Sequence, residues 1–176
     1  MSRALVFLFC AAVLVRLGYA LLVAVMGGTP LESDSTVYLE TARSFLAMGK
    51  LGRVIDDVFV PDTVRMPLYP LFIAAVFWLT GSESPWTIVV CQSLTDSLTV
   101  VLVAATARAF APRWSMPAGW LACFWPNLVV HAGEVLTDSL FTLFFAAGVC
   151  AILWAMKAAK PSTMLAPDSC SDTTES

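Results

Sequence analysis

Charged residues are scarce in this chain of 176 residues, of which they make up only 13%. The net charge is −3, and no run of Lys and Arg with interleaved aromatic residues is present. Nucleic-acid binding, which depends on a basic surface, therefore has no support. Hydrophobic residues make up 59% of the chain, which excludes an ordinary soluble globular domain. The lipid bilayer is the expected surroundings of this protein.

Metal-binding patterns are also lacking. The single histidine is His131, and none of the five cysteines stands in a Cys-x-x-Cys or Cys/His ligand spacing. The cysteines are expected to be small packing residues. We expect no cofactor. Glu32 and Asp34 form a short acidic pair that could hold a divalent cation, but such pairs are too common to predict a site.

Long apolar segments dominate what is present. Segments of about 20 apolar residues span a bilayer, and the candidates are 4–26, 87–110, 116–130 and 138–156. The first is expected to be an uncleaved signal anchor, because its apolar run continues past Arg16 without a small-x-small cleavage site. A fifth segment, 66–81, is short and carries Pro67 and Pro70 in its first turns, so a surface helix is expected there.

The basic residues indicate the topology, because cytoplasmic loops are rich in Lys and Arg. If segment 66–81 does not cross, all flanking basic residues lie in the cytoplasm, and segment 27–86 is external. The fold class is then an all-α integral membrane protein, a bundle of four transmembrane helices plus external juxtamembrane helices. It occupies residues 1–160, and 161–176 are expected to be a disordered polar tail. The basic residues in question are Arg3, Arg108, Arg113, Lys157 and Lys160.

Two opposite charges fall at similar depths in the first two spans. At about 1.5 Å per residue, Arg16 lies about 18 Å from residue 4, and Asp96 lies about 14 Å from residue 87. An unpaired charge in the bilayer is costly. We therefore predict a buried Arg16–Asp96 pair that holds the two helices in register. A role in lining a lipid-phosphate groove is the alternative.

The external segment carries the strongest chemical signal. Asp34 begins an amphipathic helix that Gly49 should end. It is either an N-cap or a functional carboxylate, and the helix dipole favours its anion in both cases. Arg65 stands just before Pro67, so it cannot lie deep in a regular helix, and its guanidinium should be free to meet an anion.

The predicted topology places four charged residues on one membrane face, namely Asp34, Arg65, Glu134 and Asp138. A carboxylate can orient and deprotonate an acceptor hydroxyl or amine. A fixed arginine can offset the charge that grows on a departing phosphate, to which its planar fork is well matched. Together they suit chemistry on a lipid-linked anionic substrate.

The order of motifs resembles the N-terminal part of the GT-C fold glycosyltransferases, in particular the protein-mannosyltransferase and aminoarabinose-transferase-like group with its bacterial RgtA/B/C/D-like domain. The resemblance covers roughly residues 4 to 157. The motifs are Asp34-Ser-x-x-Tyr38-x-x-x-Ala42, then Gly49, Arg65-x-Pro67-Leu68-Tyr69-Pro70, Gln92 with Asp96, and Val135-Leu136-Thr137-Asp138-Ser139-Leu140-Phe141.

The resemblance implies a role for each matching residue. Asp34 would be catalytic, and Arg65 would contact the phosphate of a polyprenyl-phosphate-linked sugar donor. Asp138 or Glu134 would complete the pocket, and Tyr69 of the proline motif would also bind substrate. Transfer would occur on the external, periplasmic face of a bacterial inner membrane.

The chain departs from that family in two respects. Family members often have Pro-Pro where this chain has Met66-Pro67. They also have more spans and several hundred more residues. We therefore expect a truncated portion of a glycosyltransferase, for which a second polypeptide is one source of the missing spans. The alternative is a non-catalytic membrane protein, either an inactive remnant or a partner that stabilises another subunit.

Overall fold

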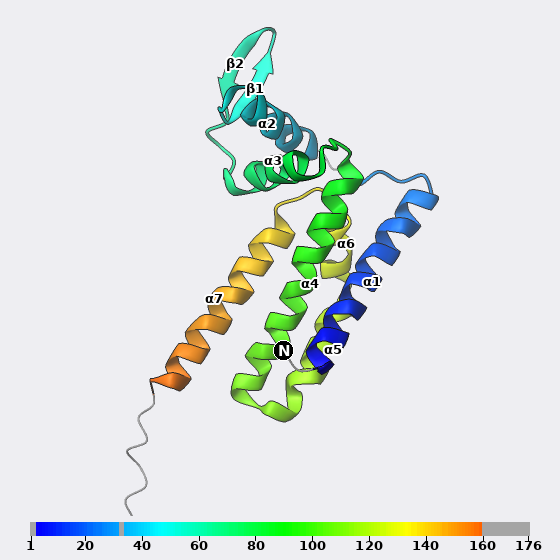
Figure 1. Cartoon of the computed structure of the whole chain (residues 1–176), viewed down its shortest axis with the longest axis vertical. Coiled ribbons are helices and arrows are strands. Elements are labelled where there is room, and N and C mark those ends of the chain that lie inside the picture. Colours follow the sequence, from blue (N-terminus) through cyan, green and yellow to red (C-terminus); the bar gives the residue numbers. More distant parts are fainter. Residues whose placement is uncertain (1–2, 32–33, 160–176) are drawn as a thin grey trace, which may run out of the picture.

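The computed structural model describes residues 3–31 and 34–159. The predicted tail at 161–176, and Glu32 of the acidic pair, lie outside the described residues. Within those ranges the chain is mostly helical. Three of these helices are long and apolar enough to cross a membrane (Figure 1). They are α1 (Arg3–Val25), α4 (Pro85–Phe110) and α7 (Asp138–Ala158).

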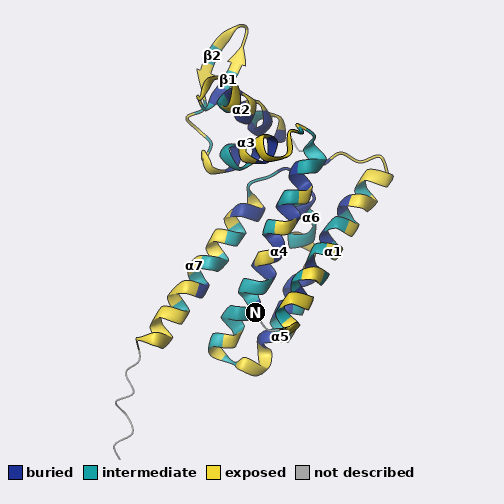
Figure 2. Ribbon diagram, viewed as in Figure 1, coloured by how far each residue is buried: buried dark blue, intermediate teal, exposed yellow. Residues whose placement is uncertain are grey.

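Helix α4 is the centre of the bundle, with α1 on one side and α7 on the other (Figure 1). In an 18-residue apolar stretch of each helix, half of α4 is buried inside the protein, against 22% of α1 and 17% of α7. Figure 2 shows the outer helices with long exposed stretches, and these carry large apolar side chains such as Phe7, Leu14 and Phe145. Such an exterior suits lipid rather than water.

The third predicted span, 116–130, is not one helix. It forms α5 (Ser115–Cys123) and α6 (Pro126–Ala132), after a short 3₁₀ turn, η1 (Pro112–Trp114). The break falls at Trp125, which is extended with φ −65° and ψ 117°. Pro126 causes it, because proline has no N–H and disfavours a helical conformation in the preceding residue. The predicted count of four spans is therefore not confirmed.

Two further helices, α2 (Ser35–Met48) and α3 (Leu68–Thr80), pack on each other across one end of the bundle (Figure 1). Each ends on a glycine with positive φ, Gly49 at 68° and Gly81 at 65°. The two N–H groups bond to carbonyls one turn earlier, as in a left-handed helix cap. Helix α3 lies within segment 66–81, which was predicted as a surface helix, and with 13 residues it is shorter than a span.

A β-hairpin connects α2 to α3, so the prediction of an all-α fold is wrong for this segment. Strands β1 (Gly52–Ile55) and β2 (Val58–Pro61) pair antiparallel. Asp56 and Asp57 join them with φ values of 50° and 63°. Positive φ at both central residues defines the two-residue turn that matches strand twist, and aspartate tolerates it better than most residues. The runs of β-branched and aromatic residues on both sides of this Asp-Asp pair were the missed signal.

Candidate functional site at the capped end of the bundle

Arg65 and Asp34 form an ion pair, with 2.7 Å between Arg65 Nη2 and Asp34 Oδ1. Asp34 immediately precedes α2, and Arg65 lies in the loop before α3. The Asp34 side chain makes no capping hydrogen bond to α2. Its carboxylate points to Arg65 instead and is 54% exposed, so it is open to a second partner. The interpretation of Asp34 as a helix cap alone is therefore wrong.

Asp62 and Tyr38 hold Arg65 in place. The sequence analysis did not select Asp62, and it named Tyr38 only as part of a motif. Asp62 Oδ1 accepts hydrogen bonds from the N–H groups of Val64 and Arg65, both at 3.2 Å. The Arg65 guanidinium also lies 5.7 Å from the Tyr38 ring centre. The hydrogen bond to Asp34 raises the pKa of Arg65 above its usual value, against the opposing effect of burial. The sequence did carry a signal for this turn, because Asp62 stands three residues before Arg65 in a loop bounded by prolines.

A pocket of about 410 Å³ opens beside Arg65, between the α2–α3 pair and the start of α7. We call it the aromatic pocket. Arg65 and Asp138 are its charged lining residues, and most of its wall is apolar. Its residues are Tyr38, Val64, Arg65, Met66, Leu68, Tyr69, Thr137, Asp138, Leu140, Phe141 and Phe144. The structure thus brings three predicted substrate-binding residues into one cavity, with Asp34 bonded to its arginine.

Tyr69 contributes its ring to this pocket, while its hydroxyl serves the core. The hydroxyl donates to Gln92 Oε1 at 2.8 Å, and the ring meets that of Tyr38 edge to face at 5.1 Å. Burial, with smaller effects of Tyr38 and Asp138, raises the pKa of Tyr69 well above its usual value. The hydroxyl therefore stays protonated and remains a hydrogen-bond donor to α4.

Gln92 joins the site to the bundle. Its side-chain nitrogen donates to the carbonyls of His131 and Glu134, at 3.0 and 2.7 Å, and contacts Ser139 Oγ at 3.2 Å. One buried amide thereby links α3, α4 and the loop before α7. This fixes the loop from which Asp138 starts α7. The sequence analysis named Gln92 only together with Asp96, among the motifs of the family resemblance.

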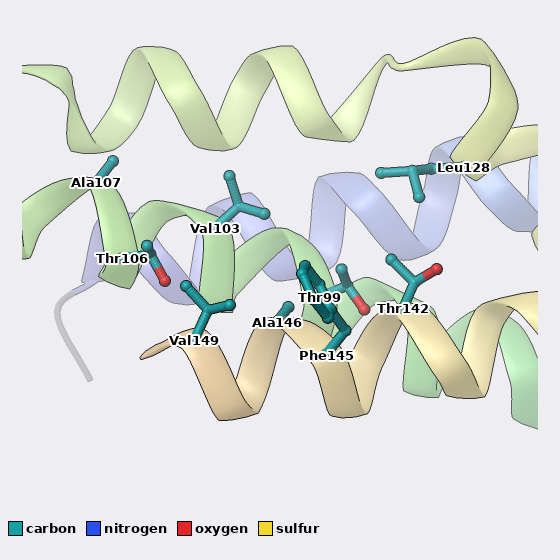
Figure 3. Close-up of a pocket in the computed structure, with 9 residues that line it drawn as sticks. All are labelled: Thr99, Val103, Thr106, Ala107, Leu128, Thr142, Phe145, Ala146 and Val149. Carbon is teal, nitrogen blue, oxygen red and sulfur yellow. The ribbon is translucent and has the colours of Figure 1, made fainter. Parts of the chain in front are cut away.

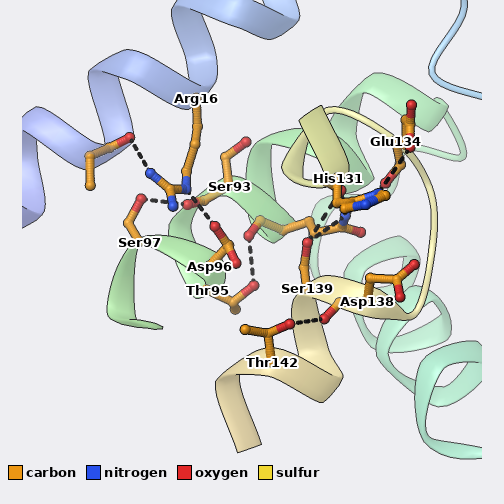
Figure 4. A network of polar contacts seen from close by, with 12 residues as sticks. Arg16, Ser93, Thr95, Asp96, Ser97, His131, Glu134, Asp138, Ser139 and Thr142 are labelled. Atoms are coloured by element: carbon orange, nitrogen blue, oxygen red, sulfur yellow. Dashed lines mark hydrogen bonds and ion pairs between the residues drawn. The ribbon is translucent and has the colours of Figure 1, made fainter. Parts of the chain in front are cut away.

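Glu134, the alternative to Asp138, does not line the aromatic pocket. Its carboxylate lies 3.3 Å from Nδ1 of His131, as Figure 4 shows. The structure therefore separates the two acids that the sequence left open. Asp138 lines the same pocket as Arg65, whereas Glu134 contacts His131 near the end of α6.

The predicted Arg16–Asp96 pair is present in the structure. Arg16 Nε lies 2.5 Å from Asp96 Oδ2, and both side chains are buried (Figure 4). Arg16 Nη1 also donates to the carbonyl of Ala12. Neither residue of the pair lines the aromatic pocket. This arrangement favours the structural role, joining α1 to α4, over a role in a phosphate groove.

A second hollow lies lower in the bundle, between α4, α6 and α7, with a volume of about 370 Å³ (Figure 3). It is almost wholly apolar and its lining contains no ionisable side chain. Its residues are Thr99, Val103, Thr106, Ala107, Leu128, Thr142, Phe145, Ala146 and Val149. This lining offers packing surface but no acid–base chemistry.

Metal binding finds no ready donor set in the part of the chain that the structure describes. No three His, Cys, Asp or Glu side chains of residues 3–31 and 34–159 come together as a possible metal site. The charged groups at the aromatic pocket are instead a cation and two carboxylates. This combination can bind an anion and move a proton.

Comparisons of this chain with family models, with curated proteins and with solved structures found no match. The function must therefore be argued from the residues and their geometry.

Proposed function

We propose that this chain is a membrane glycosyltransferase, or a portion of one, that uses a polyprenyl-phosphate-linked sugar donor. The observation that carries the proposal is the Arg65–Asp34 pair beside the aromatic pocket. A cation, an adjacent open carboxylate and an apolar cavity are the features needed to hold a lipid phosphate and activate an acceptor next to it.

Arg65 is the phosphate ligand in this proposal. A guanidinium carries five N–H donors in a planar fork, so bonding to Asp34 leaves donors for a phosphate. Asp62 and Tyr38 hold the loop and the side chain, which reduces the ordering that binding would otherwise require. The donor lipid lies along Phe141 and Phe144, which line the pocket on α7, one of the three apolar helices.

Asp34 is the proton acceptor. It takes the proton of the acceptor hydroxyl or amine as that atom bonds to the anomeric carbon. The bond between that carbon and the phosphate oxygen breaks in the same displacement, which inverts the configuration. The lipid phosphate leaves with the additional negative charge, which Arg65 offsets. Asp138 shapes the same pocket from α7.

We further propose that α5 and α6 together act as a fourth, broken span, and that α2, α3 and the hairpin lie on the external face of a bacterial inner membrane. Arg3, Arg108 and Lys157 support this orientation, because they lie at the other end of the bundle from α2 and α3 (Figure 1). Positive charge favours the cytoplasmic side.

The test is sugar transfer by membranes that contain this chain, with and without a polypeptide encoded next to it, from a polyprenyl-phosphate sugar. The proposal expects transfer that Asp34→Asn abolishes. Transfer that persists in Asp34→Asn would refute it.

A non-catalytic role is the second candidate, because the Arg65–Asp34 pair also ties the start of α2 to the start of α3. A protein of this kind would stabilise a partner subunit. It predicts that Asp34→Asn loosens the α2–α3 unit and that the wild-type chain does not bind a polyprenyl phosphate.

A further inference from the structure

A smaller pocket of about 320 Å³ lies next to the aromatic pocket and shares Arg65 with it. We call it the Thr41 pocket. The loop before α3 and the first turn of α3 contribute to both, with Met66 and Tyr69 in the aromatic pocket and Pro67 and Pro70 in the other. Its residues are Thr41, Leu51, Asp62, Thr63, Arg65, Pro67 and Pro70.

Two buried polar atoms of this pocket lack a hydrogen-bond partner within residues 3–31 and 34–159. They are Thr41 Oγ1 and Asp62 Oδ2. Thr41 is 1% exposed, and the Asp62 side chain is 9% exposed. Buried polar groups without partners destabilise a fold, so they are rare and point to a missing partner. The turn at Val64 and Arg65 occupies only the other oxygen of Asp62.

The charges around Asp62 decide which kind of partner fits. Arg65 Nη1 lies 3.9 Å from Asp62 Oδ2, so a second cation at this oxygen would be repelled. An anion would be repelled by the carboxylate itself. A neutral hydroxyl can donate to Asp62 Oδ2, and another can bond to the Thr41 hydroxyl. Leu51, Pro67 and Pro70 offer apolar surface for the C–H face of a ring.

We propose that the Thr41 pocket binds the neutral sugar ring of the donor, through hydroxyl contacts to Asp62 and Thr41. The choice of a sugar over another neutral polyol rests on the proposed function. Because Arg65 lines both pockets, a sugar in one is adjacent to a phosphate at the guanidinium, as the glycosyl phosphate linkage requires. Thr41 and Asp62 are then determinants of donor specificity.

Direct binding to the full chain in detergent tests this proposal with four probes: a neutral hexose 1-phosphate, the methyl glycoside of the same hexose, inorganic phosphate, and an amino-sugar phosphate. The wild type should bind the methyl glycoside saturably and the hexose phosphate more tightly than either fragment. An amino-sugar phosphate should bind no more tightly than the neutral one. Saturation-transfer NMR or calorimetry measures each probe.

Thr41→Val is the main variant, because it removes the hydroxyl and keeps the shape. It should weaken glycoside binding by about tenfold and leave phosphate binding unchanged. Thr80→Val is the matched control, since Thr80 lines neither pocket and bonds to the Val76 carbonyl of its own helix. Asp62→Asn keeps an oxygen for the turn but presents a donor in place of Oδ2, and should also lose glycoside binding.

A thermal melt separates loss of binding from loss of folding. Without ligand, Thr41→Val should melt at the wild-type temperature or higher, because it removes an unsatisfied hydroxyl.

Absence of saturable glycoside binding by the wild type, or equal binding by Thr41→Val, would overturn the inference. Tighter binding of the amino sugar would also overturn it. Phosphate binding without glycoside binding refutes this inference alone, whereas glycoside binding without phosphate binding refutes the proposed phosphate site.

Discussion

Arg65 and Asp34 stand 31 positions apart, and their side chains meet at 2.7 Å. The pair forms because α2 and α3 pack on each other while the hairpin returns the chain between them. Arg65 also lines both pockets at the end of the bundle. A change at this arginine should therefore affect ligand binding more than it affects the transmembrane part of the fold.

We expect Arg65→Ala to weaken binding of a polyprenyl phosphate by about ten- to a hundredfold, the range for hydrogen bonds to a charged group. Fluorescence or calorimetric titration in detergent measures the dissociation constant. Arg43→Ala is the matched control, because Arg43 forms an exposed pair with Glu83 and lines neither pocket. Equal losses in the two variants would contradict a specific phosphate site.

Asp34→Asn should lower transfer by at least about a hundredfold, the lower range for loss of a general base, while donor binding changes little. The amide keeps an oxygen for Arg65 but cannot take a proton. Transfer from a radiolabelled donor gives the rate, and Glu83→Gln serves as the control for loss of one exposed carboxylate. Full activity of Asp34→Asn would rule out the proposed role of this residue.

The Arg16–Asp96 pair can be tested by a double-mutant cycle. Arg16→Leu should destabilise the protein by about 3–5 kcal/mol, because it leaves a buried carboxylate without its cation. Combining it with Asp96→Leu should recover part of that loss. Unfolding in mixed micelles provides the free energies. Additive effects of the two substitutions would show that the ion pair contributes no coupling energy.

Tyr69 predicts a specific response to alkaline pH. Its pKa is raised in the folded protein, so the unfolded chain loses the proton first as pH rises through the ordinary tyrosine range near about 10. The unfolded state is then favoured, and the free energy of unfolding falls as pH rises further. Tyr69→Phe should reduce this slope above about pH 10. Tyr69 stays protonated while the protein is folded, so it adds no phenolate absorbance. The wild type and the variant should therefore show equal phenolate absorbance until the wild type unfolds.

Cysteine labelling tests the proposed orientation in a background without the five native cysteines. An impermeant thiol reagent applied from outside should modify Ile55→Cys in the hairpin and spare Pro112→Cys. Both positions are exposed in the structure, so accessibility to the reagent reports the side of the membrane. The reverse labelling pattern would overturn the orientation.

The sequence by itself determined the features that depend on local composition and spacing. The length of the apolar segments predicted the three helices that can cross a membrane. The similar depth of Arg16 and Asp96 in two of these helices predicted their ion pair. Gly49 marked a helix end correctly. Pro126 was equally visible, and its effect on the segment 116–130 was missed because hydrophobicity was weighed over backbone geometry.

Only the tertiary structure decided which polar groups share a cavity. Asp138 lines the aromatic pocket and Glu134 turns to His131, although the two stand four positions apart. The sequence likewise could not show that Thr41 Oγ1 and Asp62 Oδ2 lack a hydrogen-bond partner among the described residues. The reason is physical: spacing fixes the face of a helix on which a residue lies, whereas the packing of α2, α3 and α7 against one another fixes what that face meets.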